Sequence, residues 1–325
     1  MAKWLTILAI AAALLWSGWW VMGSQAVSRG AEAGIAAARA AGWRVEYDDL
    51  SVSGFPNRFD TTVDAPEILA PSGWGVTAPF LQVFALSYRP NEVIAVAPGQ
   101  LTVATPAGPV EVTSDDLRAS ATVTPSTTPE LERATVVAEG VTVTARAGGL
   151  ALARGQLASR AVGSPLRHDV ALSLSDLAPD RFALSLIDPE GRLPAAIESV
   201  ELDGTVELDR PLAAGAEPRL RALDLRRGDL RWGEVALDFA GRLDVDGGGL
   251  PSGVLTLEAE GWDVLLDLAV GAGVLPADRL PLVAAVLGAM AENGRIAVEL
   301  SLREGAAFLG PIPLGPLPRL PAPML

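Results

Sequence analysis

The strongest constraint on the fold is a period of two that begins near residue 43 and recurs almost to the C-terminus. Residues 117–124 alternate strictly between apolar and polar side chains, and breaks with proline or glycine separate similar runs. Successive side chains of a β-strand point to opposite faces, so the pattern predicts strands with one apolar face, joined by turns. We therefore expect a mainly β chain with a large, curved antiparallel sheet. The other runs are residues 80–88, 93–97, 101–104, 110–113, 135–145, 170–174, 182–186, 197–208, 220–225, 235–245 and 254–259.

Two of the expected strands meet at the corner Gly54-Phe55-Pro56-Asn57. One alternating run, residues 45–52, precedes the corner, and a second, residues 59–63, follows it. Glycine, proline and asparagine favour turns, whereas phenylalanine favours burial. We expect Phe55 to be buried at this corner.

Two stretches near the C-terminus change to a helical period. Residues 262–269 form the first, and residues 281–291 form the second, which starts with a proline suited to a first turn. A helix of about 11 residues is too short to span a bilayer. It either lies buried under the sheet or closes an apolar groove as a lid, and a closing strand over residues 296–302 follows it. The apolar side chains on one face of the second helix are Leu282, Val283, Val286, Leu287 and Met290.

The N-terminus carries no charged side chain from residue 4 to residue 28, and residues 4–22 are nearly all apolar. About 20 such residues, at a rise of 1.5 Å each, match a hydrocarbon core of roughly 30 Å. Indole rings prefer the headgroup level, so tryptophans at both ends indicate a membrane-spanning anchor. The alternative is a cleaved signal peptide, for which residues 24–26 supply small side chains. The tryptophans are Trp4 at one end and Trp16, Trp19 and Trp20 toward the other.

These patterns predict four segments. Residues 1–27 form the anchor, and residues 28–42 form a helical stalk that lifts the remainder off the membrane. Residues 43–309 form the β-rich domain, with a candidate subdivision near residue 190, and residues 310–325 form a proline-rich tail. A short N-terminal tail with Lys3 favours an inside N-terminus and a domain on the far side. In a bacterium this describes a single-pass inner-membrane protein with a periplasmic domain.

Composition excludes several classes of function. The chain has 325 residues, a net charge of −14 and no cysteine. Nucleic-acid binding needs basic patches that neutralise phosphates, so we expect no nucleic-acid partner. Without cysteine there is no disulfide, thiolate nucleophile or thiolate metal site. The hydrophobic share of 50% is enough for a sizeable core.

No group of residues has the pattern of a catalytic, metal or cofactor site. His168 is the only histidine, and its place before an alternating run is typical of a solvated residue at the start of a strand. Residues 244–249 resemble a calcium loop, but Gly248 and Leu255 stand at positions where oxygen ligands are needed. A hairpin turn explains this segment better. We therefore expect no enzymatic activity and no cofactor.

Several motifs together resemble the alphaproteobacterial domain-of-unknown-function family 2125 (DUF2125), and they cover essentially the whole chain. The resemblance implies an inner-membrane anchor and a periplasmic domain, and it assigns no activity. Residues 232–246 and 253–257 are more loosely similar to AsmA-like envelope proteins, which implies a long curved sheet with an apolar inner face and a link to phospholipid traffic or outer-membrane assembly. The family motifs are Gly42-Trp43-Arg44-Val45-Glu46-Tyr47, Gly54-Phe55-Pro56-Asn57-Arg58-Phe59, and residues 14–20, 85–95, 133–140 and 308–316.

Two kinds of function fit these features, and an enzyme whose mechanism leaves no recognisable motif is the third class that remains. The first is a protein that binds or guides lipids or other amphiphiles along an apolar sheet face, with the inner membrane and a phospholipid or other amphiphile as partners. The second is a non-catalytic envelope scaffold or assembly factor with a closed core. A continuous apolar cleft favours the first, and a packed sandwich favours the second. Protein partners are not indicated by the sequence.

Overall fold

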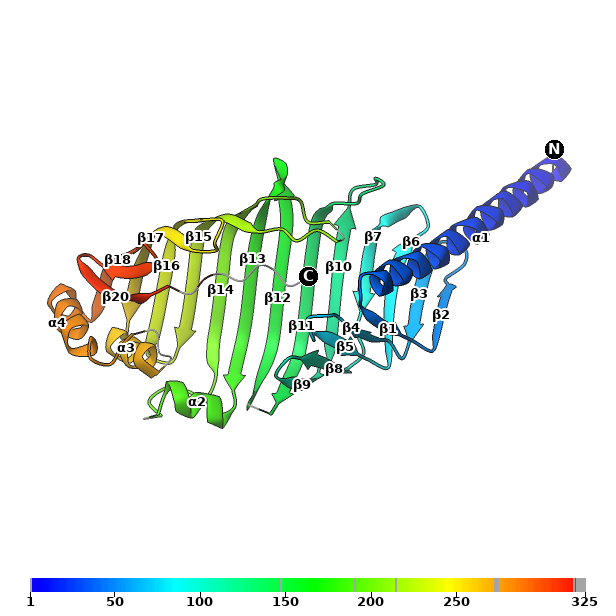
Figure 1. Ribbon diagram of the computed structural model, residues 1–325. Coiled ribbons are helices and arrows are strands. Elements are labelled where there is room, and N and C mark those ends of the chain that lie inside the picture. Colours follow the sequence, from blue (N-terminus) through cyan, green and yellow to red (C-terminus); the bar gives the residue numbers. More distant parts are fainter. Residues whose placement is uncertain are drawn as a thin grey trace. The chain divides into compact units, whose positions relative to one another are not determined.

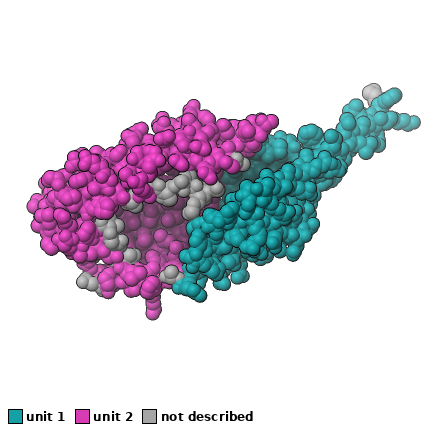
Figure 2. All heavy atoms as spheres, viewed as in Figure 1, with its two compact units in different colours: residues 1–122, 143–146 teal, residues 123–142, 147–325 magenta. Residues whose placement is uncertain are grey.

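The computed structural model describes residues 2–146, 148–189, 191–213, 215–271, 275–317 and 319. Contacts within the chain divide it into two compact units, which Figure 2 colours separately. Unit 1 comprises Met1–Thr122 and Val143–Arg146, and unit 2 comprises Val123–Thr142 and Ala147–Leu325. The candidate subdivision near residue 190 falls inside unit 2 and stays a prediction.

Unit 1 is built from short antiparallel strands (Figure 1). They are β1 (Arg44–Glu46), β2 (Asp49–Ser53), β3 (Arg58–Asp64), β4 (Glu67–Leu69), β5 (Gly75–Thr77), β6 (Phe80–Leu86), β7 (Arg89–Val96), β8 (Gln100–Thr105), β9 (Gly108–Thr113) and β10 (Asp116–Val123). They pair in two series, β2–β3–β6–β7–β10 and β1–β4–β5–β8–β9.

Unit 2 is a meander in which consecutive strands pair. Its strands β11 to β18 have 9–16 residues, whereas the strands of unit 1 have 3–8. From β12 to β20, each strand is antiparallel to the next in sequence. The prediction of a mainly β chain with a large antiparallel sheet is confirmed. The strands are β11 (Leu131–Ala145), β12 (Gly148–Val162), β13 (Ser164–Pro179), β14 (Ile197–Leu208), β15 (Leu220–Trp232), β16 (Val235–Val245), β17 (Pro251–Glu260), β18 (Arg295–Arg303), β19 (Ala306–Leu309) and β20 (Ile312–Pro316).

The chain begins with one long helix, α1 (Ala2–Ala40), which is rich in alanine, the strongest helix former. It ends before Gly42, whose φ of +89° suits glycine, and the Trp43 N–H donates to the Ala38 carbonyl over 3.0 Å. Residues 28–40 of the segment expected at residues 28–42 lie in this helix, while the division into an anchor and a stalk stays a prediction. The second half of α1 is not a free stalk, because the helix contacts β1, β2 and β3 of unit 1.

Three short helices belong to unit 2: α2 (Arg181–Ile187), α3 (Trp262–Gly271) and α4 (Leu280–Met290). The two helices expected near the C-terminus are confirmed as α3 and α4. The strand expected at residues 182–186 is wrong, because these residues form α2. Asp180 caps this helix by accepting a 2.8 Å hydrogen bond from the Ala183 N–H, a local signal that outweighs five alternating residues.

Two clusters of buried apolar side chains in unit 2 lie where helices meet the sheet. One cluster joins α4 to β17 and β18, and a second joins α3 to β15 and β16. Part of the proline-rich tail, β20, pairs with β19. Residues 318 and 320–325 of that tail lie outside the described residues.

The prediction that Phe55 is buried is wrong. Its side chain is 57% exposed, whereas Phe59, four residues later on β3, is 4% exposed. Phe55 lies in the tight turn between β2 and β3, where a side chain points away from both strands. Phe59 lies within β3 under the helix α1, and it supplies the buried aromatic ring of this corner.

Candidate functional site

The strand registers of unit 2 bring apolar side chains from neighbouring strands into one row. Leu172 on β13 lies opposite Leu202 on β14, and Phe239 on β16 lies opposite Leu257 on β17. Side chains at paired positions of adjacent strands lie on the same face and contact one another. From β12 to β18 the row is Leu157, Leu172, Leu202, Gly228, Phe239, Leu257 and Val298.

Two further rows extend this surface along the strands. Residues two positions apart in a strand share a face, so the rows before and after the first lie on the same side of the sheet. We call the surface formed by the three rows the apolar face. The added rows are Gly155, Leu174, Val200, Leu230, Leu237, Ala259 and Ile296, and Ser159, Val170, Gly204, Leu225, Gly241, Leu255 and Leu300.

The opposite side of the same strands, which we call the charged face, carries polar side chains in matching rows. The alternation in the sequence therefore predicted the separation of the two faces correctly. One such row from β12 to β18 is Gln156, Ser173, Glu201, Asp229, Asp238, Glu258 and Ala297.

A β-bulge keeps the apolar face continuous across β15. Leu225 lies opposite Gly204, and Arg227 lies opposite Asp203, so Arg226 is an extra residue between two paired positions. Immediately before the bulge the apolar residues of β15 occupy odd positions, 223 and 225, and after it they occupy even positions, 230 and 232. The extra residue shifts the phase by one, and both halves of β15 thus present their apolar side chains to the same side.

The described helices cover one end of the apolar face. On α4, Val283 and Leu287 are buried in the cluster that contains Ala259, Ile296 and Val298. Of the other residues expected on this helix face, Val286 is partly buried in the same cluster, while Leu282 and Met290 are exposed. The helix thus joins a core at this end of the sheet.

Away from the helices, the apolar face keeps solvent-accessible surface within the described part of unit 2. Leu157 is 48% exposed, and Leu172, Leu202 and Phe239 are only half-buried. The space-filling view shows unit 2 hollowed on the side turned to the viewer (Figure 2). The structure therefore contains an apolar surface with a closed end and an open remainder.

His168 is fully buried, so the expectation of a solvated residue is wrong. It lies opposite Ala161 and Val206, in line with the apolar face. Its Nδ1 is 3.1 Å from the hydroxyl of Ser159, and its Nε2 has no hydrogen-bond partner among the described residues. We assign it no chemistry, because one buried imidazole without a second titrating group is not a catalytic arrangement.

One connection crosses neighbouring strands near this histidine. The Leu131 N–H at the start of β11 donates to the Leu212 carbonyl over 2.8 Å, and Glu130 pairs with Ala213. Leu212 and Ala213 belong to the connection between β14 and β15. This connection therefore returns past β13 and β12 to reach β11 (Figure 1).

The bulged Arg226 organises an ion-pair cluster on the charged face. Its Nη1 lies 3.2 Å from Asp169 Oδ1 and its Nε lies 2.6 Å from Asp203 Oδ1. Thr205 donates a 2.8 Å hydrogen bond to Asp169. The pKa of Asp169 is lowered, mainly by this hydrogen bond and further by Arg226 and Arg160, while the pKa of Arg226 is raised by its carboxylate partners.

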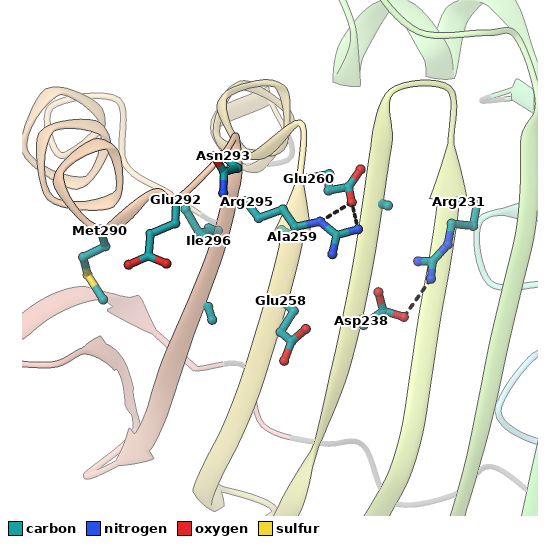
Figure 3. A pocket seen from close by; sticks show the side chains of 12 residues that line it. Arg231, Asp238, Glu258, Ala259, Glu260, Met290, Glu292, Asn293, Arg295 and Ile296 are labelled. Carbon is teal, nitrogen blue, oxygen red and sulfur yellow. Dashed lines mark hydrogen bonds and ion pairs between the residues drawn. The ribbon is translucent and has the colours of Figure 1, made fainter.

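A hollow of ≈ 770 Å³ lies on the charged face near α4, and Figure 3 shows the side chains around it. Arg231 donates to Asp238 over 2.8 Å, and Arg295 pairs with Glu260. These are cross-strand pairs of long surface side chains, which stabilise a protein weakly. In the described ranges, no group of three or more metal-ligating side chains gathers here or elsewhere. Asp246 accepts hydrogen bonds from the Gly248 and Leu250 N–H groups, which confirms the hairpin turn expected at residues 244–249.

The N-terminal helix is a second feature that bears on function. Within the described residues, α1 is the one helix long and apolar enough to cross a membrane. Trp4 and Trp19 are exposed on it. Trp16 and Trp20, which share another side, donate their indole N–H groups to carbonyls of unit 1.

A model of a bacterial family, described as "Uncharacterized protein conserved in bacteria (DUF2125)", matches residues 19–318. The chain belongs to the DUF2125 family. The match extends from the apolar part of α1 past the end of β20, so the family resemblance seen in the motifs is confirmed over nearly the whole chain. No curated protein and no solved structure matches this DUF2125 chain significantly. The looser similarity to AsmA-like proteins has no support from these comparisons.

The sequence did not single out the residues that form the apolar face. Leu172, Leu202 and Phe239 each belong to a predicted alternating run, but the runs alone do not state which residues lie opposite one another. The registers supply that relation. The signal that could have found them is the shared phase of apolar residues in successive long runs.

Proposed function

We propose that this DUF2125 protein is a membrane-anchored envelope protein that holds a phospholipid or other amphiphile against the apolar face of unit 2. The row from Leu157 to Val298 carries the proposal, because its members are apolar or glycine and several of them remain open to solvent. Contiguous apolar surface of this kind marks binding sites in soluble domains. Each methylene buried against it contributes about 0.8 kcal/mol, so an acyl chain is stabilised there in proportion to the length that it buries.

The packing of α1 supports an uncleaved anchor. Trp16, Trp20 and Gly23 contact unit 1, and they would be lost if the chain were cleaved after residue 26. Cleavage would then leave the ring of Phe59 without its cover. We therefore propose that α1 is retained in the bacterial inner membrane, with the short N-terminal tail inside and the strands of both units in the periplasm.

The proposed role is binding without catalysis. The rows of the apolar face contain no general acid or base, His168 beside them is buried, and several carboxylates of the charged face are in cross-strand ion pairs, such as Asp169 with Arg226. Acidic side chains on that face would keep unit 2 from lying flat on anionic headgroups with its charged side. The apolar face would then be the side available to acyl chains.

Site-specific photocrosslinking tests this proposal. Phe239 is replaced by p-benzoylphenylalanine in the full chain expressed in bacteria, and Ala240, the next residue and on the opposite face, is replaced in a matched control. After irradiation, intact-mass measurement should find an adduct of phospholipid mass at position 239 and none at 240. The same pair can be made at Leu202 and Glu201.

Two results would contradict the proposal. Equal adducts at positions 239 and 240 would indicate contact with bulk membrane lipid instead of a site on one face. Absence of any lipid adduct at both 239 and 202 would remove the support for amphiphile binding and favour a scaffold whose apolar face is covered by protein.

A further inference from the structure

The turn between β2 and β3 is fastened to the apolar part of α1. The indole Nε1 of Trp16 donates to the Pro56 carbonyl over 2.8 Å, and that of Trp20 donates to the Arg58 carbonyl over 2.7 Å. The ring of Phe55 lies edge-on to the Trp20 ring, with centroids 5.5 Å apart. Residues 54–58 therefore sit at a fixed level along α1, beside the tryptophans that close its apolar segment.

Four backbone carbonyls of this turn accept hydrogen bonds: those of Gly54, Pro56, Asn57 and Arg58. Proline has no backbone N–H, so only the carbonyl of Pro56 needs a hydrogen-bond partner. The indole N–H of Trp16 is that partner. The Arg58 N–H donates to the Gly54 carbonyl over 2.9 Å, and the Ser87 N–H donates to the Asn57 carbonyl over 3.0 Å. Paired carbonyls of this kind avoid the penalty of several kcal/mol that an unpaired group has in a bilayer.

The side chains of the turn have the composition of a membrane interface. Phe55 is 57% exposed, and Tyr88, next to Ser87 in the adjoining β6–β7 turn, is 59% exposed. Arg58 and Arg89 are exposed beside these rings and both lie opposite Leu86. Aromatic rings with adjacent arginines match the boundary between acyl chains and phosphate groups.

The length of α1 decides where this turn lies if the helix crosses a bilayer. Trp4 and Trp20 are 16 positions apart, which is about 24 Å along a helix, while the hydrocarbon core is roughly 30 Å thick. With Trp4 at one boundary, Trp20 cannot pass beyond the opposite headgroup layer. A tilt of the helix would bring Trp20 closer to the middle of the bilayer. A turn that binds Trp16 and Trp20 must therefore reach the membrane surface.

We infer that the β2–β3 turn is a second membrane contact, in which Phe55 and Tyr88 enter the headgroup layer on the side of the membrane where unit 1 lies. Unit 1 is then seated on the bilayer instead of being raised above it on a spacer. The inference rests on the proposed anchoring by α1 and is independent of the ligand on the apolar face of unit 2.

Nitroxide depth measurement tests this inference, and the absence of cysteine from the chain makes single labelling sites simple. Full-length variants Asn57→Cys and Tyr88→Cys are labelled and reconstituted in vesicles of phosphatidylethanolamine and phosphatidylglycerol. Leu8→Cys marks the acyl-chain region. Ala36→Cys, exposed on α1 and about 24 Å beyond Trp20, marks the aqueous side. Collision rates with oxygen and with a water-soluble nickel chelate give the depth of each label.

Labels at positions 57 and 88 should have a several-fold lower nickel accessibility than the label at 36, and an oxygen-to-nickel ratio between those at 36 and 8. In the Asn57→Cys background, Phe55→Ser should move the ratio toward the aqueous value, and Phe55→Leu should preserve it. An aqueous ratio at 57 and 88, with a lipid ratio at 8, overturns the inference alone. An aqueous ratio at position 8 overturns the proposed anchoring and the inference together.

Discussion

Gly23 on α1 lies directly against the ring of Phe59 on β3, so closely that a methyl group at position 23 would overlap the Cζ atom of that ring. The ring is held in place by its burial, 4% exposed, and by Trp20, whose ring centroid is 6.2 Å away. Glycine at position 23 is thus a requirement of the contact between helix and strand, although glycine weakens an isolated helix.

This contact predicts opposite effects for two glycine substitutions in one helix. Gly23→Ala should lower the free energy of unfolding of unit 1 by about 1–3 kcal/mol, as overpacking does. Gly30→Ala should raise it by up to about 1 kcal/mol, because no atom lies within 4 Å of the new methyl group and alanine is the better helix former. Urea unfolding of both variants in the same detergent checks the prediction, and a stabilising Gly23→Ala would contradict the packing.

Two phenylalanines of the same corner should differ in their contribution to stability. Phe59→Ala should destabilise the protein by about 3–5 kcal/mol, because it empties a buried position. Phe55→Ala should cost about 1 kcal/mol, since the exposed ring loses mainly its edge contact with Trp20. Thermal unfolding in detergent distinguishes them. Equal losses would mean that Phe55 is buried after all.

The helix-covered end of unit 2 depends on Trp232, which is 4% exposed and packs with Val235 and Val264. Its indole Nε1 donates to the Pro194 carbonyl over 2.7 Å. Trp232→Ala should destabilise unit 2 by about 3–5 kcal/mol. Trp232→Phe should cost less and chiefly reflect the loss of the hydrogen bond, about 1–3 kcal/mol. Denaturant unfolding followed by circular dichroism measures both. A Trp232→Phe variant as stable as the parent would show that the hydrogen bond to Pro194 does not contribute to stability.

Acid should lower the free energy of unfolding of unit 2, because it protonates Asp169. Its pKa lies below the ordinary value of 3.8, first because of the Thr205 hydroxyl and then because of Arg226 and Arg160. A carboxyl with a lower pKa in the folded than in the unfolded chain stabilises the fold above the unfolded pKa, and the contribution is lost as the pH falls through the folded pKa.

The Asp169→Asn variant should therefore be less stable than the parent near neutral pH, and the difference should shrink below the ordinary pKa. Thr205→Val should behave similarly but more weakly, and Thr205→Ser should keep the acid dependence because it keeps the hydroxyl. Urea unfolding at a series of pH values gives the comparison. A difference that stays constant into acid would show that the ionised form of Asp169 does not stabilise the fold.

The alternating runs were enough to predict the architecture and the separation of the two faces, because the period of two follows directly from strand geometry. They also held information that the prediction left unused. His168 is in phase with Val170 and Leu172, so the same rule places it on the apolar side. Its position before the run led to the wrong expectation of solvation.

Other features depend on distances between residues that no local pattern contains. The doubled arginine at 226 and 227 marks a change of phase, but only the pairing with Asp203 and Gly204 makes it a bulge. The contacts of this turn with Trp16 and Trp20, which lie on a helix 38–40 positions earlier in the chain, are likewise absent from the local pattern. A tight turn and a buried corner have the same local composition.

The meander of unit 2 has a consequence for how such a protein can change in length. From β15 to β17, each strand pairs with its two sequence neighbours, so a hairpin gained or lost between β15 and β17 would leave the strand pairings on either side of it unchanged. Each added hairpin would widen the sheet by roughly 10 Å, two strand spacings. The width of a sheet of this architecture therefore changes in steps of one hairpin.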